Sequence, residues 1–202
     1  MSKPSVFFSS DHHFFHANII KYANRPFADI EEMNFELISR HNKAVSNNDA
    51  IYFIGDFCFS TNISVITNII RQLNGEKHFI CGNHDGIMQH GEIKRLFKTF
   101  STSPHKEINI QDELEPSGKK SITLCHYAMR VWNKSHYGAY HLYGHSHGNL
   151  PDDPNSLSLD IGVDCFNYAP ISYTQIKQLM KAKTWTPHIR EKDTHSHKAI
   201  PV

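Results

Sequence analysis

The feature that most constrains this 202-residue chain is a set of five short polar segments, each following an apolar run typical of a β-strand. In chain order they are Asp11-His12-His13, Gly55-Asp56, Gly82-Asn83-His84-Asp85, His126 and Gly144-His145-Ser146-His147. In layered α/β folds, the loops at the carboxyl ends of strands form the crevice in which ligands bind. The segments supply carboxylate, imidazole and amide groups, which is the composition of a site for two metal ions.

The pattern of apolar residues predicts an α/β fold, with strands and helices alternating in the first half and mostly strands in the second. Strands are expected over residues 5–10, 50–54, 77–81, 105–110, 122–125, 139–143 and 157–163. Helices are expected over residues 16–24, 30–45, 63–73, 86–97 and 172–183. Asp29 with Glu32, and Ser172 with Gln175, have the spacing of capping boxes at helix starts. This order indicates two packed sheets with helices outside.

The length suits one domain, expected over residues 1–186, followed by a polar tail over 187–202. The formal net charge of +1, from 21 basic and 20 acidic residues, argues against charge-driven binding to long nucleic acid. The four cysteines have no C-x-x-C spacing and are expected to be buried, reduced thiols. No run has the length of a signal-peptide core or a membrane span, so the expected location is the cytoplasm, without a membrane partner.

Together the five segments resemble the calcineurin-like metallophosphoesterase superfamily, whose pattern is D-x-H, G-D, G-N-H-D/E, a lone His and G-H-x-H. The resemblance spans residues 6–147. Two stretches, residues 11–20 and Asn24-Arg25-Pro26-Phe27, make the chain similar to the small, single-domain phosphoesterases of bacteria and their phages. The resemblance implies two packed mixed β-sheets flanked by helices, the α/β/β/α sandwich of that superfamily.

The resemblance also implies a ligand set for two divalent metal ions. The ligands would be Asp11, His13 and His147 for the first ion, Asn83, His126 and His145 for the second, and Asp56 as a bridge. Asp11 and His13 are two residues apart, so both could reach one ion as the chain leaves its strand. The Asp56 carboxylate would offset the repulsion between two close cations. Mixed nitrogen and oxygen ligands suit Mn²⁺, the expected metal, and also iron or Zn²⁺.

His84 is the expected general acid, because it follows the expected ligand Asn83 and so lies close to the metals. An imidazole, whose ordinary pKa is about 6.5, can protonate a leaving oxygen near neutral pH. The alternative is a structural histidine. Ser/Thr protein phosphatases extend Gly-Asp into G-D-x-x-D-R-G, in which the second Asp pairs with the catalytic His and the Arg holds phosphate. This chain has Phe59 and Ser60 at those places, so a protein phosphatase is not expected and the partner of His84 is left open.

Arg25 is the expected phosphate ligand, because a guanidinium matches the geometry of phosphate. His16 and Asn18 are weaker candidates for substrate binding. Phe14 and Phe15 could stack on a base, although packing in the core is favoured.

Three other histidines are not expected to take part in the site. His12 lies between two expected ligands and would point away from them, so packing is favoured. His195 and His197 lie in the polar tail and are expected to be solvated.

The expected function is metal-dependent hydrolysis of a phosphoester, most simply by a phosphodiesterase acting on small or nucleotide-type substrates. A phosphomonoesterase or nucleotidase is the first alternative, and a nuclease acting on nucleic-acid ends is another. A binding module that kept the fold and lost the chemistry belongs to a different class, which the intact ligand set and His84 disfavour. No obligate protein partner is evident from the sequence.

Overall fold

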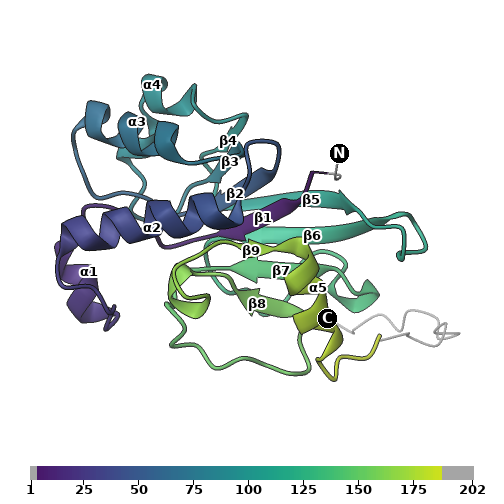
Figure 1. The fold of residues 1–202 in the computed structure, drawn as a ribbon. Helices are drawn as coiled ribbons and strands as arrows, with labels where there is room; N and C mark the ends of the chain where they lie inside the picture. The colour runs from purple at the N-terminus through teal and green to yellow at the C-terminus, as the bar shows by residue number, and fades with distance from the viewer. Residues whose placement is uncertain (1–3, 188–202) are drawn as a thin grey trace, which may run out of the picture.

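The computed structural model describes residues 4–187, which form a five-stranded sheet packed against a four-stranded sheet, with helices flanking them (Figure 1). The first sheet contains β1 (Val6–Ser9), β2 (Ala50–Ile54), β3 (Glu76–Ile80), β4 (Thr99–Ser101) and β9 (Ile171–Ser172). The second sheet contains β5 (His105–Gln111), β6 (Lys119–Cys125), β7 (Tyr140–Tyr143) and β8 (Ser158–Asp160). The predicted fold class, two packed mixed sheets flanked by helices, is confirmed.

Five helices and three 3₁₀ turns connect the strands of the described part. The helices are α1 (Ala17–Tyr22), α2 (Ile30–Ala44), α3 (Ile63–Gln72), α4 (Gly91–Lys94) and α5 (Tyr173–Lys181). The turns are η1 (Ile87–Gln89), η2 (Ser135–Tyr137) and η3 (Val163–Cys165). The side chain of Asp29 caps α2 by accepting a hydrogen bond from the Glu32 N–H, and Ser172 and Gln175 form a complete capping box on α5. Both predicted helix starts are therefore confirmed.

The order of strands places the carboxyl ends of the parallel strands at one edge of each sheet. The first sheet runs β4-β3-β2-β1-β9, with β1 to β4 parallel and β9 antiparallel to β1. The second runs β5-β6-β7-β8, with β6 to β8 parallel and β5 forming an antiparallel hairpin with β6. β1, β2, β3, β6 and β7 each lead into one of the five polar segments.

Two apolar layers hold these elements together. One lies between the first sheet and the helices α2 and α3, where Leu37 and Ile70 pack with Phe53 of β2. The other lies between the sheets, where Phe8 of β1 packs with Leu142 of β7 in a cluster that α5 also joins. The first sheet is thus buried on both faces, which explains why β2 is apolar at nearly every position.

Several predicted boundaries shift. The helix expected over residues 86–97 is broken into η1 and α4, because His90 between them is extended and the stretch contains two glycines that disfavour helix. The strand expected over 157–163 ends at Asp160. β4 and β9 are too short to leave a periodic signal and were not predicted.

Within residues 4–187, no helix has the length and apolar character needed to cross a bilayer. The four cysteines are free, as predicted, but Cys165 is exposed rather than buried because it lies on the turn η3 at the surface. The expected tail over 187–202, with His195 and His197, lies outside the described residues apart from residue 187.

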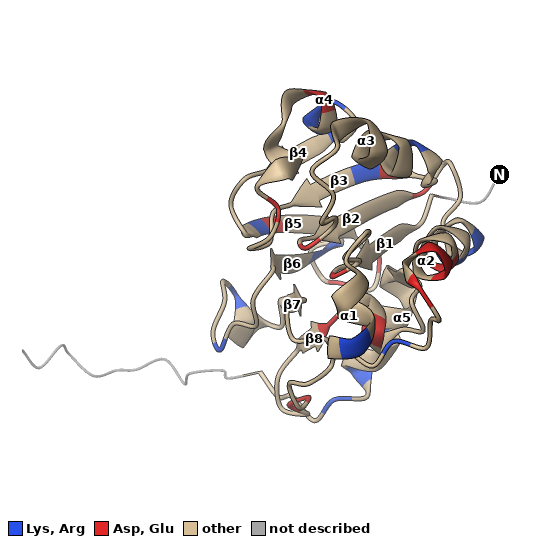
Figure 2. Cartoon of the chain, turned by 90° about the vertical axis from the view of Figure 1, so that its left-hand side faces the viewer, with Lys and Arg blue, Asp and Glu red and all other residues tan. Residues whose placement is uncertain are grey.

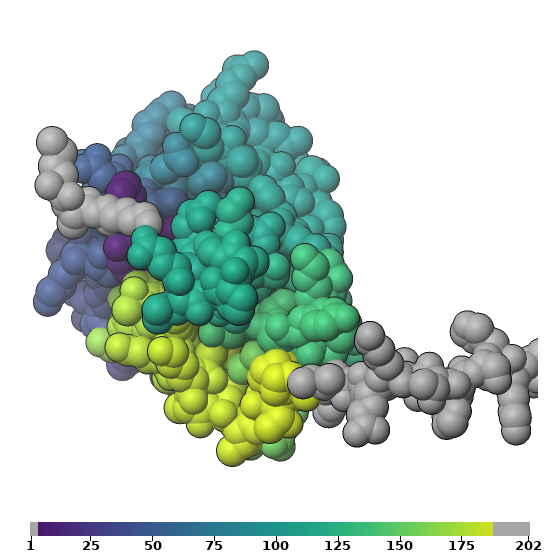
Figure 3. Space-filling view, turned by 90° about the vertical axis from the view of Figure 1, so that its right-hand side faces the viewer, coloured from purple at the N-terminus to yellow at the C-terminus, as the bar shows by residue number. Residues whose placement is uncertain are grey.

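The β5–β6 hairpin is tied to α5 by a buried carboxylate, Asp112. It accepts hydrogen bonds from the Tyr173 hydroxyl at 2.7 Å and from Lys177 Nζ at 2.6 Å. Figure 3 shows the teal hairpin segment against the yellow-green α5 segment. Burial alone would raise the pKa of Asp112, but the bonds from Lys177 and Tyr173 outweigh burial and lower the pKa to about 2.

We predict that Asp112→Asn lowers the free energy of unfolding by about 2 kcal/mol at pH 7. A carboxyl group whose pKa is lower in the folded state stabilises fully above its unfolded pKa, about 4, and loses that contribution as the pH falls toward its folded value, about 2. Urea unfolding of the parent and the variant across this pH range should show their difference shrinking. A difference that stays constant down to the acid end would contradict the assignment.

Candidate metal centre

The five polar segments converge at one end of the two sheets. The Asp11 N–H donates to the Gly55 carbonyl at 3.1 Å, which joins the loop after β1 to the loop after β2. The Gly144 N–H donates to the His126 carbonyl at 3.1 Å, which joins the loops after β7 and β6. The His145 N–H donates to Asp11 Oδ2 at 2.9 Å and connects the two sheets. The ends of strands from both sheets therefore build one site.

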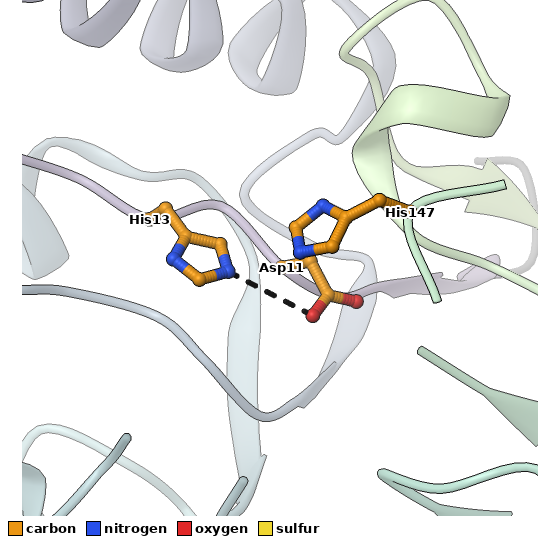
Figure 4. A group of neighbouring side chains, drawn as sticks. All are labelled: Asp11, His13 and His147. Carbon is orange, nitrogen blue, oxygen red and sulfur yellow. Dashed lines mark ion pairs between the residues drawn. The ribbon is translucent and has the colours of Figure 1, made fainter. Parts of the chain in front are cut away.

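Asp11, His13 and His147 form the first cluster, with one ligand atom from each within 4.8 Å of the others (Figure 4). Asp11 and His13 are almost fully buried, and Asp11 Oδ1 lies 4.0 Å from His13 Nε2. Both of these atoms are buried without a hydrogen-bond partner. Burying unpaired polar atoms is costly, and a divalent cation would pair with a carboxylate oxygen and an imidazole nitrogen at once. The residues fit a metal ion.

Asp56, His126 and His145 form the second cluster, again with one ligand atom from each within 4.8 Å of the others. The Asp56 carboxylate lies between the clusters, with Oδ1 3.5 Å from His126 Nε2 and Oδ2 3.8 Å from His13 Nε2. Asn83 Oδ1 lies 3.0 Å from the same His126 nitrogen. The structure thus brings together all seven side chains expected as ligands.

Hydrogen bonds orient three of the imidazoles. His126 Nδ1 lies 2.9 Å from the Ile54 carbonyl, His147 Nδ1 lies 2.7 Å from Asp164 Oδ2, and His13 Nδ1 contacts the ring of a neighbouring histidine. In each case Nδ1 is engaged, so Nε2 is the atom that remains for the cluster. Metal-binding histidines are commonly fixed in this way through their second nitrogen.

The electrostatics of the two clusters differ. Burial raises the pKa of Asp11 to about 6 and lowers the pKa of His13 to about 3. Burial would shift Asp56 and His126 in the same directions, but their mutual contact outweighs it, lowering the pKa of Asp56 to about 2 and raising that of His126 to about 9. A metal ion bound at the second cluster would compete with a proton for the His126 imidazole.

Five of the seven expected ligands have left-handed backbones. They are Asp11 (φ 58°), His13 (φ 53°), Asp56 (φ 51°), His145 (φ 68°) and His147 (φ 48°). Residues other than glycine seldom adopt this region, and each such residue costs about 1–3 kcal/mol. Strain of this kind concentrates at functional sites, where the surrounding structure imposes it. Here it turns side chains of neighbouring residues toward one centre.

Two glycines of the motifs are required by close packing around the same centre. A Cβ on Gly144 would collide with Ser10 Oγ and Asp11 Oδ2, and a Cβ on Gly55 would lie 2.5 Å from His126 Nδ1. Gly55 also has a φ of 86°. These positions explain why glycine precedes a ligand in both segments.

Two buried carboxylates that sequence reasoning did not single out hold the ligand loops. Asp85 accepts hydrogen bonds from the backbone N–H groups of Asp56 at 2.7 Å and Gly82 at 2.6 Å. Asp160 accepts one from Ser146 Oγ at 2.8 Å. Asp85 is the last residue of the G-N-H-D segment, and Asp160 lies within the strand predicted over 157–163, so their positions carried a signal.

The expected role of Arg25 as a phosphate ligand does not fit its surroundings. The side chain is fully buried, and Asp164 accepts hydrogen bonds from its Nε at 2.8 Å and from one terminal nitrogen at 2.9 Å. The carbonyls of Asp11 and His12 accept further hydrogen bonds from Arg25. The fifth N–H group points to Met33 Sδ at 3.5 Å, so the guanidinium has no N–H group left for a substrate. Asp164 was not foreseen because it lies far from Arg25 in the sequence.

The remaining expected site residues, His84, His16 and Asn18, are exposed or partly buried. His84 is exposed, its N–H donates to Asp56 Oδ1 at 3.0 Å, and its ring lies 5.0 Å from that of Phe59. His16 is partly buried and stacks on Phe59 with ring centroids 4.0 Å apart. Asn18 is exposed on α1. His84 and His16 thus lie beside the clusters, and both contact the ring of Phe59.

Three neighbouring side chains test the packing predictions. His12 and Phe14 are almost fully buried, as predicted. Phe15, expected in the core, is 38% exposed because its left-handed backbone turns it outward.

No protein-family model matches the chain. The chain is 34% identical over 187 residues to the uncharacterized protein MJ1445 of Methanocaldococcus jannaschii, which covers 90% of this chain and 94% of that protein. The chain belongs to the MJ1445 family. Among solved structures, the protein of unknown function AQ665 from Aquifex aeolicus superposes with a TM-score of 0.63 at 21% identity, over 88% of this chain and 100% of that chain, and shares the fold. Pseudomonas putida nuclease MPE superposes with a TM-score of 0.41 at 16% identity, over 70% of this chain and 61% of that chain, which is too low to assign a fold or a function.

We predict that divalent cations raise the melting temperature of this MJ1445-family protein and that EDTA lowers it. An ion that binds only the folded state adds about 2.7 kcal/mol at a hundredfold excess over its Kd. Thermal unfolding in EDTA, and after addition of Mn²⁺ or Zn²⁺, measures the effect. In Asp56→Asn, which removes the carboxylate shared by the clusters, the melting temperature should change much less when ions are added. Equal melting temperatures of the parent in EDTA and with every ion would contradict the prediction.

Proposed function

We propose that this protein is a two-metal phosphoester hydrolase of the calcineurin-like type, and that it acts as a phosphodiesterase on small or nucleotide-type substrates. The observation that carries the proposal is the pair of adjacent Asp/His clusters, Asp11–His13–His147 and Asp56–His126–His145, with the Asp56 carboxylate between them. The order of the motifs in the sequence supports the same assignment. Asn83, whose amide oxygen adjoins His126, completes the ligand set.

When bound, a pair of divalent ions, expected to be Mn²⁺ with iron or Zn²⁺ also suited, supplies charge stabilisation at phosphorus and an activated water. The protein's own residues hold the ligands in place. Asp11 and Asp56 contribute negative charge that offsets repulsion between cations. The strained loops present these side chains without rearrangement, which is the preorganisation that electrostatic catalysis requires.

We propose that His84 is the general acid, and its surroundings support this role. It is exposed at the rim, while its backbone N–H is fixed by Asp56 Oδ1. Phe59, at the place where the protein phosphatases have an acidic residue, packs beside the His84 ring. An apolar contact restricts the ring without holding its proton. His84 would therefore deliver that proton to the leaving oxygen of a substrate bound at the clusters.

The distribution of charge favours a small substrate. Figure 2 shows Lys and Arg interspersed with Asp and Glu over the described part of the chain, in line with the net charge of +1. A long polyanion would need many basic contacts, and its binding would weaken steeply as salt rises. Asn83, His84 and His145 are exposed, so the clusters open to solvent on one side. An open site suits an accessible phosphodiester with a small leaving group.

We predict that His84→Gln lowers kcat by about 10²–10⁴-fold on a diester with an alkoxide leaving group. The loss should be much smaller on a nitrophenyl diester, because nitrophenolate leaves with little protonation. Steady-state assays with matched metal content measure both. Since His84 is not a ligand, metal content should not change. Equal losses on the two substrates would argue against a general-acid role.

A comparison of substrate classes tests the preference for diesters. The metal-loaded protein should hydrolyse bis-nitrophenyl phosphate and cyclic nucleotides with higher kcat/KM than the corresponding monoesters. Activity on small diesters should vary little between low and moderate salt. Asp56→Asn should be inactive on every substrate and serves as the control for contaminating enzymes. A strong preference for monoesters, or activity confined to long nucleic acid with a steep salt dependence, would replace the diesterase assignment.

A further inference from the structure

We propose that Arg25 and Asp164 are positioning residues that set the metal affinity of the first cluster, Asp11–His13–His147. This inference rests on the proposed metal-dependent function. It assigns a separate supporting carboxylate to each cluster, Asp164 to the first and Asp85 to the second. Neither residue has an atom free for the metal or the substrate. Their contacts lead instead to the backbone and side chains of the three ligands.

Arg25 holds the turn that separates the two early ligands. Its terminal nitrogens donate to the carbonyl oxygens of Asp11 at 2.7 Å and His12 at 2.9 Å. These carbonyls belong to the two peptide units that connect Asp11 to His13. Both ligands have left-handed backbones, with φ of 58° and 53°. A fork of fixed geometry that grips both peptides therefore stabilises a conformation that the chain would otherwise avoid.

Asp164 connects this turn to the third ligand. Its Oδ1 accepts from Arg25 Nε at 2.8 Å, and its Oδ2 lies 2.9 Å from an Arg25 terminal nitrogen and 2.7 Å from His147 Nδ1. The His147 contact is a carboxylate–histidine pair of the kind that orients metal ligands. Arg25 and Asp164 thus form one unit that links Asp11 and His13 to His147, which lies more than one hundred positions later in the chain.

The pair is enclosed so that it cannot easily rearrange. The side chains are 0% and 7% exposed. The Arg25 guanidinium lies 5.8 Å from the ring centroid of Tyr168, which also packs against Phe27, and its fifth N–H points to Met33 Sδ at 3.5 Å. All five N–H groups of Arg25 therefore have partners. A buried pair with complete hydrogen bonding keeps a single geometry.

The second cluster is supported independently. Asp85 accepts hydrogen bonds from the backbone N–H groups of Asp56, Phe57 and Gly82, whereas Arg25 and Asp164 bond to one another and to the first cluster. If the pair were only a structural salt bridge, its loss would lower the stability of the whole fold and affect metal binding at both clusters equally. A positioning role predicts an asymmetry instead, in which loss of Asp164 weakens one metal site and spares the other.

Calorimetric titration of the full-length, metal-free chain with Mn²⁺ at fixed pH tests this asymmetry. The parent should bind two ions. In Asp164→Asn, the amide nitrogen faces a donor on Arg25 or His147, so one ion should bind 10–100-fold more weakly while the other keeps its affinity. Arg25→Lys keeps the charge and loses the fork, so it should weaken the same ion, and it provides the test if Asp164→Asn does not fold.

Asp112→Asn is the matched control, because it also removes a buried, ion-paired carboxylate but at the opposite end of β6 from His126. It should lower the melting temperature and leave both affinities unchanged. Parent-like binding of two ions by folded Asp164→Asn or Arg25→Lys would overturn the inference, as would equal weakening of both ions. If the parent itself binds no ions, the proposed function fails first and the inference with it.

Discussion

The site depends on the continuation of parallel strand pairing beyond the ends of β1 and β2. After the last paired residues, the His13 N–H still donates to the Asp56 carbonyl at 3.0 Å and the Phe14 N–H to the Phe57 carbonyl at 2.9 Å. The two loops therefore run together as an irregular ladder rather than diverging as ordinary connections do. The ligands of different clusters, His13 and Asp56, come into contact as a consequence. Without that ladder the two clusters would be separate.

This arrangement has an energetic cost that the fold offsets with backbone hydrogen bonds. Left-handed residues, buried carboxylates and imidazoles without partners all oppose folding. The surrounding N–H groups are satisfied by carboxylates such as Asp85 and Asp160, and the carbonyls by Arg25. The rigid strands on one side and the packed helices on the other leave the loops little freedom to relax. The strain is thus held in the loops that carry the ligands.

Much of the fold and of the candidate site could be predicted from the sequence. Ligand motifs that follow apolar strands indicate both the fold and the edge of the sheets at which the ligands meet. The side chains of the two clusters were foreseen from these motifs together with the family resemblance that the motifs carry. Arg25 was assigned to phosphate because the residue type shows which groups a guanidinium can bind. It does not show which partner lies nearest in the folded chain. The contact with Asp164 depends on how the segment after β8 returns to β1, through a bridge between Ser10 and Gly162 that leaves no local pattern. Short elements such as β9 escaped for the same reason.

The linkage of Arg25 to Asp164 has a consequence for biosynthesis. Asp11 is synthesised before His147 and its supporting carboxylate Asp164. A ribosome must have released the segment after β8 before the first cluster can close. Truncated nascent chains that end before this segment would present Asp11 and His13 without the third ligand or the fork that shapes their turn. An ion that required all three ligands and this turn could bind the first cluster only after synthesis had passed η3.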